Sequence, residues 1–369
     1  MSKTSSDPSR NGPPDQQSPV ASKSTQEKHC QLLLVGDCML GRLVNEALES
    51  LPPEYPWGDT LPVLHRADWR LCNLECVISD RGEPWSAYPK AFHFRSAAKN
   101  IAVLQAARVN AVSLANNHAL DYGYDAMFEM LQILDRAGII YSGAGANLAQ
   151  ASRLASAEVC GCRIGLLAFT DNEPDWEATA DWPGVYYVPI DLTDVRAKNL
   201  LDRVGEYRKV VDHLTVSAHW GSNWGYVPPK EHVVFAHALV DAGADLIFGH
   251  SCHVFRGIEI YRGRPILYSA GNFVDDYAVD PVERNDQSFV YVTELENTIL
   301  RALRLYPTMI RRCHAFLAEG IYALGIAKKM RELCAAFNTT ADWNQAYRYV
   351  EVACLTDAEK RGTQAAARA

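Results

Sequence analysis

Five apolar segments of the chain each end on a polar residue that can bind a metal ion or transfer a proton. Short apolar runs bounded by turn residues are typical of buried strands. In open α/β sheets, the carboxyl ends of the strands form the crevice where ligands bind. One histidine at a strand end is usually an ordinary hydrogen-bonded residue, but five such ends favour a shared site. The five ends carry Asp37, Glu75, His118, His219 and His250.

The expected elements alternate between strands and helices before hairpins enter. Strands are predicted over 31–37, 69–79, 109–118, 213–221 and 244–254. Helices are predicted over 43–51, 96–107, 124–137, 194–207 and 231–243, and further helices after residue 301. Hairpins are predicted over 156–170 and 256–273, the second with its turn at Arg262 and Gly263. This order indicates a layered α/β sandwich.

Length and composition indicate a globular protein with a sizeable core. The 369 residues are 48% hydrophobic and 22% charged, and this length suits one large domain or two ordinary ones. The polar N-terminal segment has no apolar stretch of the signal-peptide type. We therefore expect a disordered tail over residues 1–29, a catalytic domain over 30–300, and a helical extension over 301–369 that packs on that domain.

Charge and hydropathy argue against two classes of partner. The formal net charge is −8, and no basic block is present, so we expect no nucleic-acid partner. No apolar run approaches the ~18 residues that a membrane-spanning helix requires. We therefore expect a cytoplasmic protein that has no membrane anchor. The sequence does not determine the oligomeric state and leaves a homo-oligomer open.

The ten cysteines are scattered along the chain, and several lie inside apolar runs. The cytosol keeps such thiols reduced. Cys160 and Cys162 flank Gly161 at an expected hairpin turn. A pair with this spacing can bind metal, but two small residues beside a turn are the simpler interpretation, and we favour it here.

Five motifs occur in an order that identifies a family resemblance. They are GDCMLGR (36–42), NLE (73–75), LANNHALDYG (114–123), AHWG (218–221) and FGHSCHVFRGIEIYRGRPILYSAGNF (248–273). Together they resemble the poly-γ-glutamate capsule-synthesis (CapA) family of calcineurin-like metallophosphatases, over about residues 31–276. The resemblance implies a four-layer αββα sandwich. The residues that match the family's metal and acid/base motifs are Asp37, Glu75, Asn117, His118, His219, His250 and His253.

Two departures from the superfamily pattern remove imidazoles from the expected site. Met39 stands where superfamily phosphatases usually place a histidine, and Ser251 replaces a histidine of the family's GHHPH motif. A two-metal centre for phosphoryl transfer needs both ions well ligated. A single oxygen-rich site suits Ca²⁺ best, with Mg²⁺ or Mn²⁺ as alternatives, and no organic cofactor is expected. The expected metal ligands are Asp37, Glu75, Asn117, His219 and His250.

Four functions are compatible with these residues. Phosphoester hydrolysis would use metal-activated water, and capsule-polymer synthesis is typical of family members that usually carry a membrane anchor. A non-catalytic binding module is a further alternative. The function we favour at this point resembles that of a lasso-peptide epimerase, which inverts the C-terminal tryptophan of a ribosomal precursor peptide. That peptide would be the partner of the chain.

Epimerisation requires one base and one acid on opposite faces of the α-carbon. His118 with Asp121 or Glu75 is predicted as one pair, and His253 or His219 with Asp276 or the adjacent Asp275 as the other.

Basic and aromatic residues near the motifs are candidates for substrate binding. Arg42, Arg95 and Arg256 are each able to bind a substrate carboxylate through two hydrogen bonds. Trp220 and Trp224 are predicted to line a groove for an apolar peptide end. The alternatives are structural ion pairs for the arginines and a packed loop core for the tryptophans.

Overall fold

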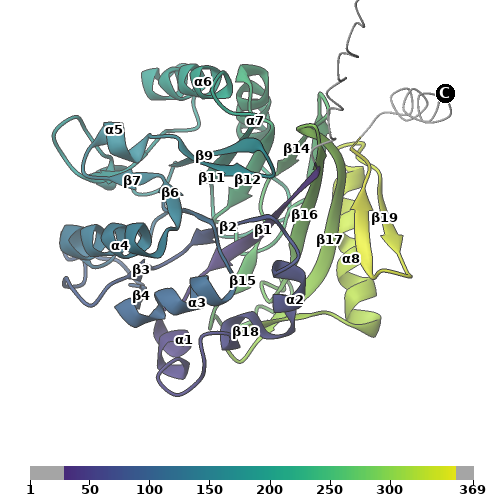
Figure 1. Ribbon diagram of the computed structural model, residues 1–369, viewed down its shortest axis with the longest axis horizontal. Helices are drawn as coiled ribbons and strands as arrows, with labels where there is room; N and C mark the ends of the chain where they lie inside the picture. The colour runs from purple at the N-terminus through teal and green to yellow at the C-terminus, as the bar shows by residue number, and fades with distance from the viewer. Residues whose placement is uncertain (1–28, 355–369) are drawn as a thin grey trace, which may run out of the picture.

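The computed structural model describes residues 29–354, which form a mixed α/β fold around two large sheets (Figure 1). The main path of the ten-stranded sheet has the spatial order β19 (Ala341–Asn344), β20 (Tyr349–Val352), β17 (Ile299–Arg311), β16 (Gln287–Glu296), β1 (His29–Cys38), β2 (Trp69–Leu74), β5 (Ala111–Ser113) and β6 (Ile140–Ser142). Beside this path, β15 (Asn272–Val274) pairs with β1, and β18 (His314–Leu317) pairs with β17. The predicted α/β class is confirmed.

The six-stranded sheet has the order β13 (Ile258–Tyr261), β14 (Arg264–Leu267), β12 (Leu246–His250), β11 (His213–His219), β9 (Cys162–Thr170) and β8 (Ala155–Val159). Two small sheets pair β3 (Val77–Ile78) with β4 (Arg95–Ser96) and β7 (Ala144–Gly145) with β10 (Gly184–Val185). The expected hairpins are present as β8–β9 and β13–β14. The turn of the second lies at Arg262 and Gly263, as predicted, and both residues have left-handed φ angles.

Helices lie on the outer sides of both sheets. In Figure 1, α6 (Val195–Arg208) and α7 (Lys230–Ala242) lie along the smaller sheet, while α3 (Ile101–Ala106) and α4 (Gly123–Ala137) lie along the larger one. The other helical segments are α1 (Arg42–Ala47), η1 (Tyr55–Thr60), α2 (Leu61–Leu64), η2 (Ala98–Asn100), α5 (Leu148–Ala151), η3 (Pro174–Trp176) and α8 (Gly320–Ala335). No helix within residues 29–354 is both long enough and apolar enough to cross a membrane.

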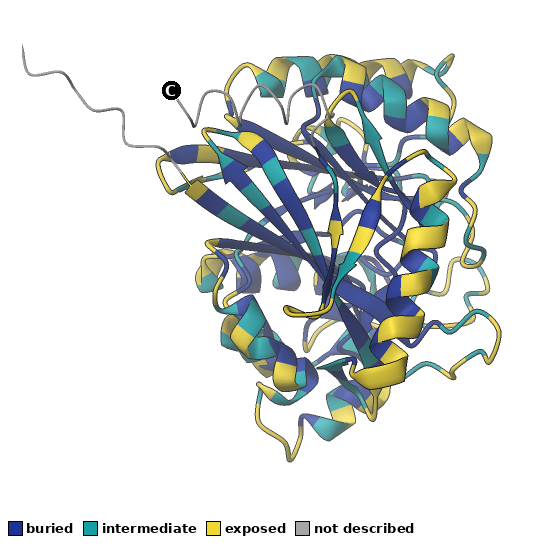
Figure 2. Cartoon of the chain, turned by 90° about the vertical axis from the view of Figure 1, so that its right-hand side faces the viewer, coloured by how far each residue is buried: buried dark blue, intermediate teal, exposed yellow. Residues whose placement is uncertain are grey.

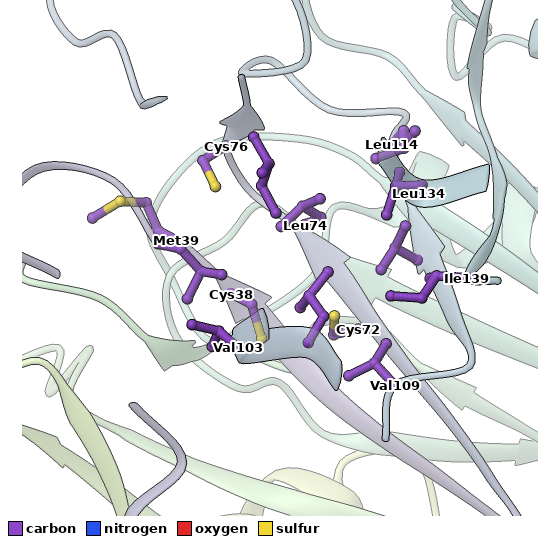
Figure 3. Packing of buried hydrophobic residues seen from close by; sticks show 14 of the residues in the cluster. Cys38, Met39, Cys72, Leu74, Cys76, Val103, Val109, Leu114, Leu134 and Ile139 are labelled. Carbon is purple, nitrogen blue, oxygen red and sulfur yellow. The ribbon is translucent and has the colours of Figure 1, made fainter. Parts of the chain in front are cut away.

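Strand β1 shows how the apolar runs place the core. Its side chains alternate between the two faces of the sheet. Leu32 and Leu34 belong to a cluster that also contains Phe248 of the smaller sheet, while Leu33 and Val35 pack on the side of α3 and α4. Figure 3 shows part of that second cluster, and Figure 2 shows that the strands are largely buried while the helices expose their outer faces. A strand buried on both faces has the continuous apolar pattern seen in the sequence.

The segment after residue 301 differs from the predicted helical extension. Strand β17 runs through this point and continues to Arg311, so the expected boundary falls inside a strand. Leu303 and Leu305 of β17 are buried, whereas Arg304 and Tyr306 between and beyond them are partly exposed. This period of two is typical of a strand, and the sequence interpretation overlooked it. Between residues 301 and 354, α8 is the one helix that fulfils the prediction. The predicted tail, apart from His29, and residues 355–369 lie outside the described residues.

Candidate metal and acid/base site

Strand ends from both sheets bring three predicted metal ligands together. Asp37 lies near the end of β1, and the parallel register of β11 and β12 places His219 opposite His250. Ligand atoms of these three side chains all lie within 4.8 Å of one another. Each side chain is at most 1% exposed. The convergence inferred from the strand ends therefore produces a compact group of one carboxylate and two imidazoles.

Gly36 allows this convergence because the backbones of two strands approach closely beside it. A Cβ atom at Gly36 would lie 1.8 Å from the carbonyl oxygen of Gly271. The same carbonyl accepts a hydrogen bond from the backbone N–H of Asp37 at 3.0 Å. Glycine at position 36 is thus required for β1 to lie close enough to β15 to place Asp37 beside that strand.

Asn73 connects the two buried carboxylates of the site. Its side-chain Nδ2 donates to Asp37 Oδ1 at 2.8 Å and also to Glu75. Its Oδ1 accepts from Asn116 Nδ2 at 3.0 Å, which fixes the orientation of the amide. Asp37 Oδ2 is buried and makes no hydrogen bond within residues 29–354. A buried carboxylate oxygen without a partner is costly unless a proton or a cation occupies the position beside it.

The two histidines direct nitrogen atoms at each other. His219 Nδ1 lies 2.8 Å from His250 Nδ1, and burial lowers the pKa of both side chains, that of His250 to about 3. Both imidazoles are therefore neutral near pH 7. His219 Nε2 lies 2.9 Å from Asn117 Oδ1, an acceptor, so Nε2 carries the hydrogen and Nδ1 presents its lone pair. This lone pair and Asp37 Oδ2 fit a divalent cation.

His118 and Asp121 form an acid/base pair on the other side of Glu75. His118 Nδ1 lies 2.6 Å from Asp121 Oδ2, which also accepts from the backbone N–H of Phe94 at 2.6 Å. The Phe94 ring stacks on the imidazole with centroids 4.0 Å apart. Burial lowers the pKa of His118, although Asp121 opposes this shift. The imidazole is therefore neutral and is oriented by Asp121, and its Nε2, which lies 3.3 Å from the amide nitrogen of Asn117, is the acceptor atom that faces the cavity.

Lys90 is a member of this group that the sequence did not indicate. Its ammonium group lies 3.4 Å from Asp121 Oδ1 and 2.9 Å from Glu173 Oε1, and it donates to the backbone carbonyl of Asn117. The side chain is only 8% exposed. Lys90 lies in an irregular loop, where no periodicity or motif marks a residue as buried, so sequence reasoning had no signal for it.

A cavity of about 550 Å³ opens onto the acid/base pair. His118, Glu75 and Asn117 lie in its wall. Because Asn117 and Glu75 also contact His219, they join the cavity to the buried metal-ligand group. The remaining wall combines cationic and aromatic side chains with small polar ones. Its cationic and aromatic members are Arg42, Lys90, Phe92, Phe94, Trp224 and Tyr277.

Of the five residues predicted to bind substrate, two line the cavity and three do not. Arg42 and Trp224 line the cavity, whereas Trp220 is fully buried and donates from Nε1 to the carbonyl of Tyr268 at 3.0 Å. Arg256 is 1% exposed and Arg95 is outside the cavity wall, so neither reaches it. The predictions for Trp220, Arg95 and Arg256 were wrong because each side chain has structural partners.

Those partners are backbone carbonyls and an aromatic ring. Arg256 Nε donates to the carbonyl of Gly225 at 2.8 Å. Arg95 lies over the ring of Tyr122, with 4.1 Å from its guanidinium carbon to the ring centroid, and donates to the carbonyl of Gly82. For Trp220, the packed alternative weighed from the sequence is the one observed. The alternative weighed for the arginines was an ion pair, whereas the contacts of Arg95 and Arg256 described within residues 29–354 are carbonyls and a ring.

The second predicted His/Asp pair does not form. His253 lines the cavity, but its Nδ1 lies 3.1 Å from Asn272 Oδ1. Asp276 instead accepts from the backbone N–H of Leu43 at 2.9 Å and pairs with the Arg42 guanidinium at 3.2 Å. A permanently charged guanidinium is a stronger partner for a carboxylate than a neutral imidazole. Among residues 29–354, the His/Asp pair that reaches the cavity wall is the one at His118.

Metal affinity should rise with pH up to about neutrality. Burial raises the pKa of Asp37 to about 7, although the Asn73 hydrogen bond opposes this shift. Below that pH a cation must displace the proton, while the two neutral histidines add no pH dependence. We expect the affinity for Mn²⁺ to rise by up to about tenfold per pH unit below pH 7, and to flatten above it. Isothermal titration calorimetry of metal-free protein from pH 5 to 8 checks this; a flat profile would contradict it.

Replacing Arg256 should destabilise the protein, whereas replacing Arg42 should weaken ligand binding. Arg256→Met leaves the carbonyls of Trp224 and Gly225 without their buried donor. We expect the free energy of unfolding to fall by about 1–3 kcal/mol. Arg42→Met is the matched variant, because Arg42 is 39% exposed and lines the cavity. Chemical denaturation of both variants measures the contrast. Equal stability of Arg256→Met and the unmodified protein would show that Arg256 has no such structural role.

Comparison with known proteins identifies relatives that cover about two thirds to three quarters of the chain. A family model described as "Bacterial capsule synthesis protein PGA_cap" matches residues 31–277. A probable polyglutamine synthesis accessory protein of Mycobacterium tuberculosis is 40% identical over 324 residues, covering 76% of this chain and 85% of that protein. The capsule biosynthesis protein CapA of Bacillus anthracis is 29% identical and covers 69% of this chain. The PGA biosynthesis protein CapA of Bacillus subtilis is 32% identical and covers 66%.

This chain spans 62% of the length of each of those two CapA proteins. Among solved structures, a hypothetical protein from Thermus thermophilus covers 76% of this chain and is itself covered completely, with 17% identity and a TM-score of 0.46. A likeness of this size carries no argument about function.

Proposed function

Because the chain belongs to the PGA_cap family of bacterial capsule synthesis proteins, we propose that it is a metal-dependent hydrolytic enzyme of polyglutamate biosynthesis. Its substrate would be a polymer of glutamate-type residues, and its reaction the cleavage of an amide bond in that polymer. The observation that carries this proposal is the His118–Asp121 pair, which faces the same cavity as Glu75 and Asn117, beside the buried metal-ligand group.

The donor set fits a divalent metal, which three residues would hold, with two more residues beside them. Asp37, His219 and His250 supply one carboxylate and two imidazoles, with Glu75 and Asn117 in contact with His219. A set with two nitrogen donors suits Mn²⁺ better than Ca²⁺, which prefers oxygen ligands. We therefore propose Mn²⁺ in place of the Ca²⁺ favoured from the sequence. When bound, such an ion polarises a carbonyl and lowers the pKa of a water molecule.

The residues of this chain supply the proton transfers. His118 Nε2 takes a proton from the attacking water, and Asp121 holds the imidazole in the tautomer that leaves Nε2 free. The protonated His118 then donates to the leaving amine, which completes the cleavage. Lys90 places a positive charge 3.4 Å from Asp121 Oδ1, on the side of the carboxylate that does not contact His118. Phe94 fixes the plane of the imidazole by stacking on it.

One cationic side chain of the cavity wall suits an anionic polymer. The Lys90 side chain is only 8% exposed and is paired with Asp121 and Glu173, so Arg42 is the cationic member of the wall that is exposed to a ligand. Arg42 also lies near Phe92, 5.7 Å from its guanidinium carbon to the ring centroid, so its side chain has support from an aromatic face. A partly exposed guanidinium at the mouth of a cavity is suited to binding a side-chain carboxylate of the polymer.

The proposal extends to the fold. We infer the four-layer αββα arrangement of calcineurin-like metallophosphatases, which is supported by three apolar clusters. One joins the two sheets, one lies on the α3 and α4 side of the larger sheet, and the third connects α6 and α7 to the smaller sheet. Each cluster buries one face of a sheet, as a stack of layers requires.

Polymer biosynthesis is better supported than the epimerisation predicted from the sequence. The names of the relatives refer to capsule, PGA and polyglutamine synthesis. Inversion of an α-carbon by two His/Asp pairs also requires a second pair, and His253 contacts Asn272 instead of an aspartate. A precursor peptide as partner stays an untested prediction, as does the cytoplasmic location.

Incubation of the metal-free protein with poly-γ-glutamate tests the proposal. We expect the polymer to shorten after addition of Mn²⁺, as measured by size-exclusion chromatography with detection of new amino groups, and not to shorten with EDTA. Parallel reactions contain a phosphodiester or, in heavy water, a peptide with a C-terminal tryptophan. Release of the alcohol from the phosphodiester with unchanged polymer would overturn the proposal in favour of phosphoester hydrolysis. Deuterium entering the terminal α-carbon would overturn it in favour of epimerisation.

A further inference from the structure

Two cysteines and an aspartate meet at the end of β1 that lies farthest from Asp37. The Sγ atoms of Cys30 and Cys160 and a carboxylate oxygen of Asp68 all lie within 4.8 Å of one another. Cys30 begins the buried part of β1 and is 3% exposed, while Cys160 and Asp68 are exposed. The three residues come from three separate segments, so the fold and not the local sequence brings them together.

The local backbone fixes two of these side chains. Cys160 and Gly161 form the two-residue turn of the β8–β9 hairpin, with φ angles of 50° and 73°. Left-handed values at both positions are typical of the tight turn that matches strand twist. Asp68 exchanges two hydrogen bonds with Gln31, one from its own N–H to the Gln31 carbonyl at 3.0 Å and one from the Gln31 N–H to Asp68 Oδ2 at 2.8 Å. The carboxylate is thereby held beside Cys30.

The surroundings of the two thiols keep both of them protonated when no cation is bound. Burial is the largest cause that raises the pKa of the Cys30 thiol, and neighbouring Cys160, Asp68 and Cys162 raise it further. Burial and Asp68 also raise the pKa of the Cys160 thiol. Each of these neighbours is neutral or negative, so ionisation of one opposes ionisation of the next. A bound divalent ion reverses that relation, because it deprotonates a coordinating thiol.

We propose that Cys30, Cys160 and Asp68 bind a thiophilic divalent cation, with Zn²⁺ as the reference ion. Two thiolates and a carboxylate are ordinary ligands of tetrahedral zinc. A water molecule would complete the tetrahedron, since the ligand atoms that lie within 4.8 Å of one another are those of these three residues. The sequence analysis considered only Cys160 and Cys162 and favoured a simple turn over a metal site for them. The positions of Cys30 and Asp68 beside Cys160 now favour a metal site.

The consequence of this site would be structural. Cys30 belongs to the larger sheet and Cys160 to the edge hairpin of the smaller one. An ion bound by both connects the two sheets at the end of β1 remote from the active site. Ligands that bind only the folded state stabilise it by mass action. We expect saturating Zn²⁺ to raise the melting temperature by about 5 °C, independently of the metal at Asp37.

Cobalt substitution in the full chain distinguishes the two metal sites. The Asp37→Asn variant weakens the active-site group, so reduced protein of this variant is titrated with Co²⁺ under argon. We expect a thiolate-to-cobalt charge-transfer band in the near ultraviolet at one equivalent, which Zn²⁺ then removes. Adding Cys160→Ser should abolish the band, and Asp68→Asn should weaken binding at least tenfold. Cys160 and Asp68 are exposed, so both changes preserve the core.

Cys313→Ser is the matched control, because Cys313 lies elsewhere on the chain and is partly exposed. It should leave the band and the zinc-dependent rise in melting temperature unchanged. Absence of the band in fully reduced protein, or its survival in the Cys160→Ser variant, would overturn the proposal. A Cys30–Cys160 disulfide found by mass spectrometry in protein isolated under argon with Zn²⁺ present would overturn it as well.

Discussion

Replacing His118 with alanine should lower the rate of metal-dependent polymer cleavage by about 10²- to 10⁴-fold, the usual contribution of a positioned acid/base group. His118 is the histidine that combines an aspartate partner with a place in the cavity wall, within residues 29–354. Without the imidazole, neither the attacking water nor the leaving amine has its proton-transfer partner. Initial rates on poly-γ-glutamate at saturating Mn²⁺ provide the measurement.

Metal binding by the His118→Ala variant separates catalysis from folding. Nε2 of His118 lies 3.9 Å from Glu75 Oε1, and the side chain is outside the group of three converging ligands. We therefore expect Mn²⁺ affinity to change by less than about tenfold. His314→Ala, which changes a histidine outside the cavity, is the matched control and should keep full activity. Unchanged polymer cleavage by the His118→Ala variant would remove His118 from the reaction.

Replacing Asp37 with asparagine should abolish both metal binding at the active site and activity. The amide keeps an acceptor for Asn73 but loses the negative charge that a cation requires. We expect the affinity for Mn²⁺ to fall by more than about 100-fold, because even residues that only support a metal ligand cost 10- to 100-fold when changed. Titration calorimetry and rates on poly-γ-glutamate measure the two losses.

The stability of the metal-free Asp37→Asn variant gives an independent readout. Asp37 is a buried acid whose Oδ2 makes no hydrogen bond within the described residues. Replacing it with a neutral amide removes the cost of desolvating a carboxylate, so the metal-free melting temperature should stay the same or rise. Asp202→Asn, on an exposed position of α6, is the matched control for both measurements. Retained Mn²⁺ affinity in Asp37→Asn would show that the ion binds elsewhere.

The strand ends were predictable because two simple rules act together on them. Asp37, His219 and His250 each follow a continuous apolar run, and parallel strands gather their carboxyl ends at one edge. The pairing of His118 with Asp121 follows from their spacing of three residues, which the chain realises in the loop before α4. These features depend on local sequence and on one general property of α/β sheets.

Other parts of the site depend on contacts between distant segments, which one sequence does not specify. His253 Nδ1 contacts Asn272, which lies 19 residues further along the chain. Asp276, the predicted partner of His253, pairs with Arg42 instead. Lys90 comes from an irregular loop. Sequence reasoning also had no means of distinguishing Trp220 from Trp224, since both lie in one aromatic segment, although the first is fully buried and the second is 45% exposed.

Met39 is a residue that the sequence analysis singled out and whose surroundings only the structure shows. The resemblance places it where a histidine is usual, and it packs in the apolar cluster shown in Figure 3. Its sulfur accepts from the backbone N–H of Gly41 at 3.1 Å. The loss of one imidazole is thus accompanied by an apolar filling of the same space, which favours a single-ion site over a two-ion centre.

Anomalous diffraction from crystals of the protein grown with Mn²⁺ tests the central claim most directly. We expect one strong peak bounded by Asp37, His219 and His250, at distances of about 2.0–2.3 Å from their ligand atoms, with Glu75 and Asn117 adjacent. The His118 imidazole should remain paired with Asp121 beside it. A stoichiometric peak at another place in the molecule, or no peak between these side chains at saturating Mn²⁺, would contradict the account.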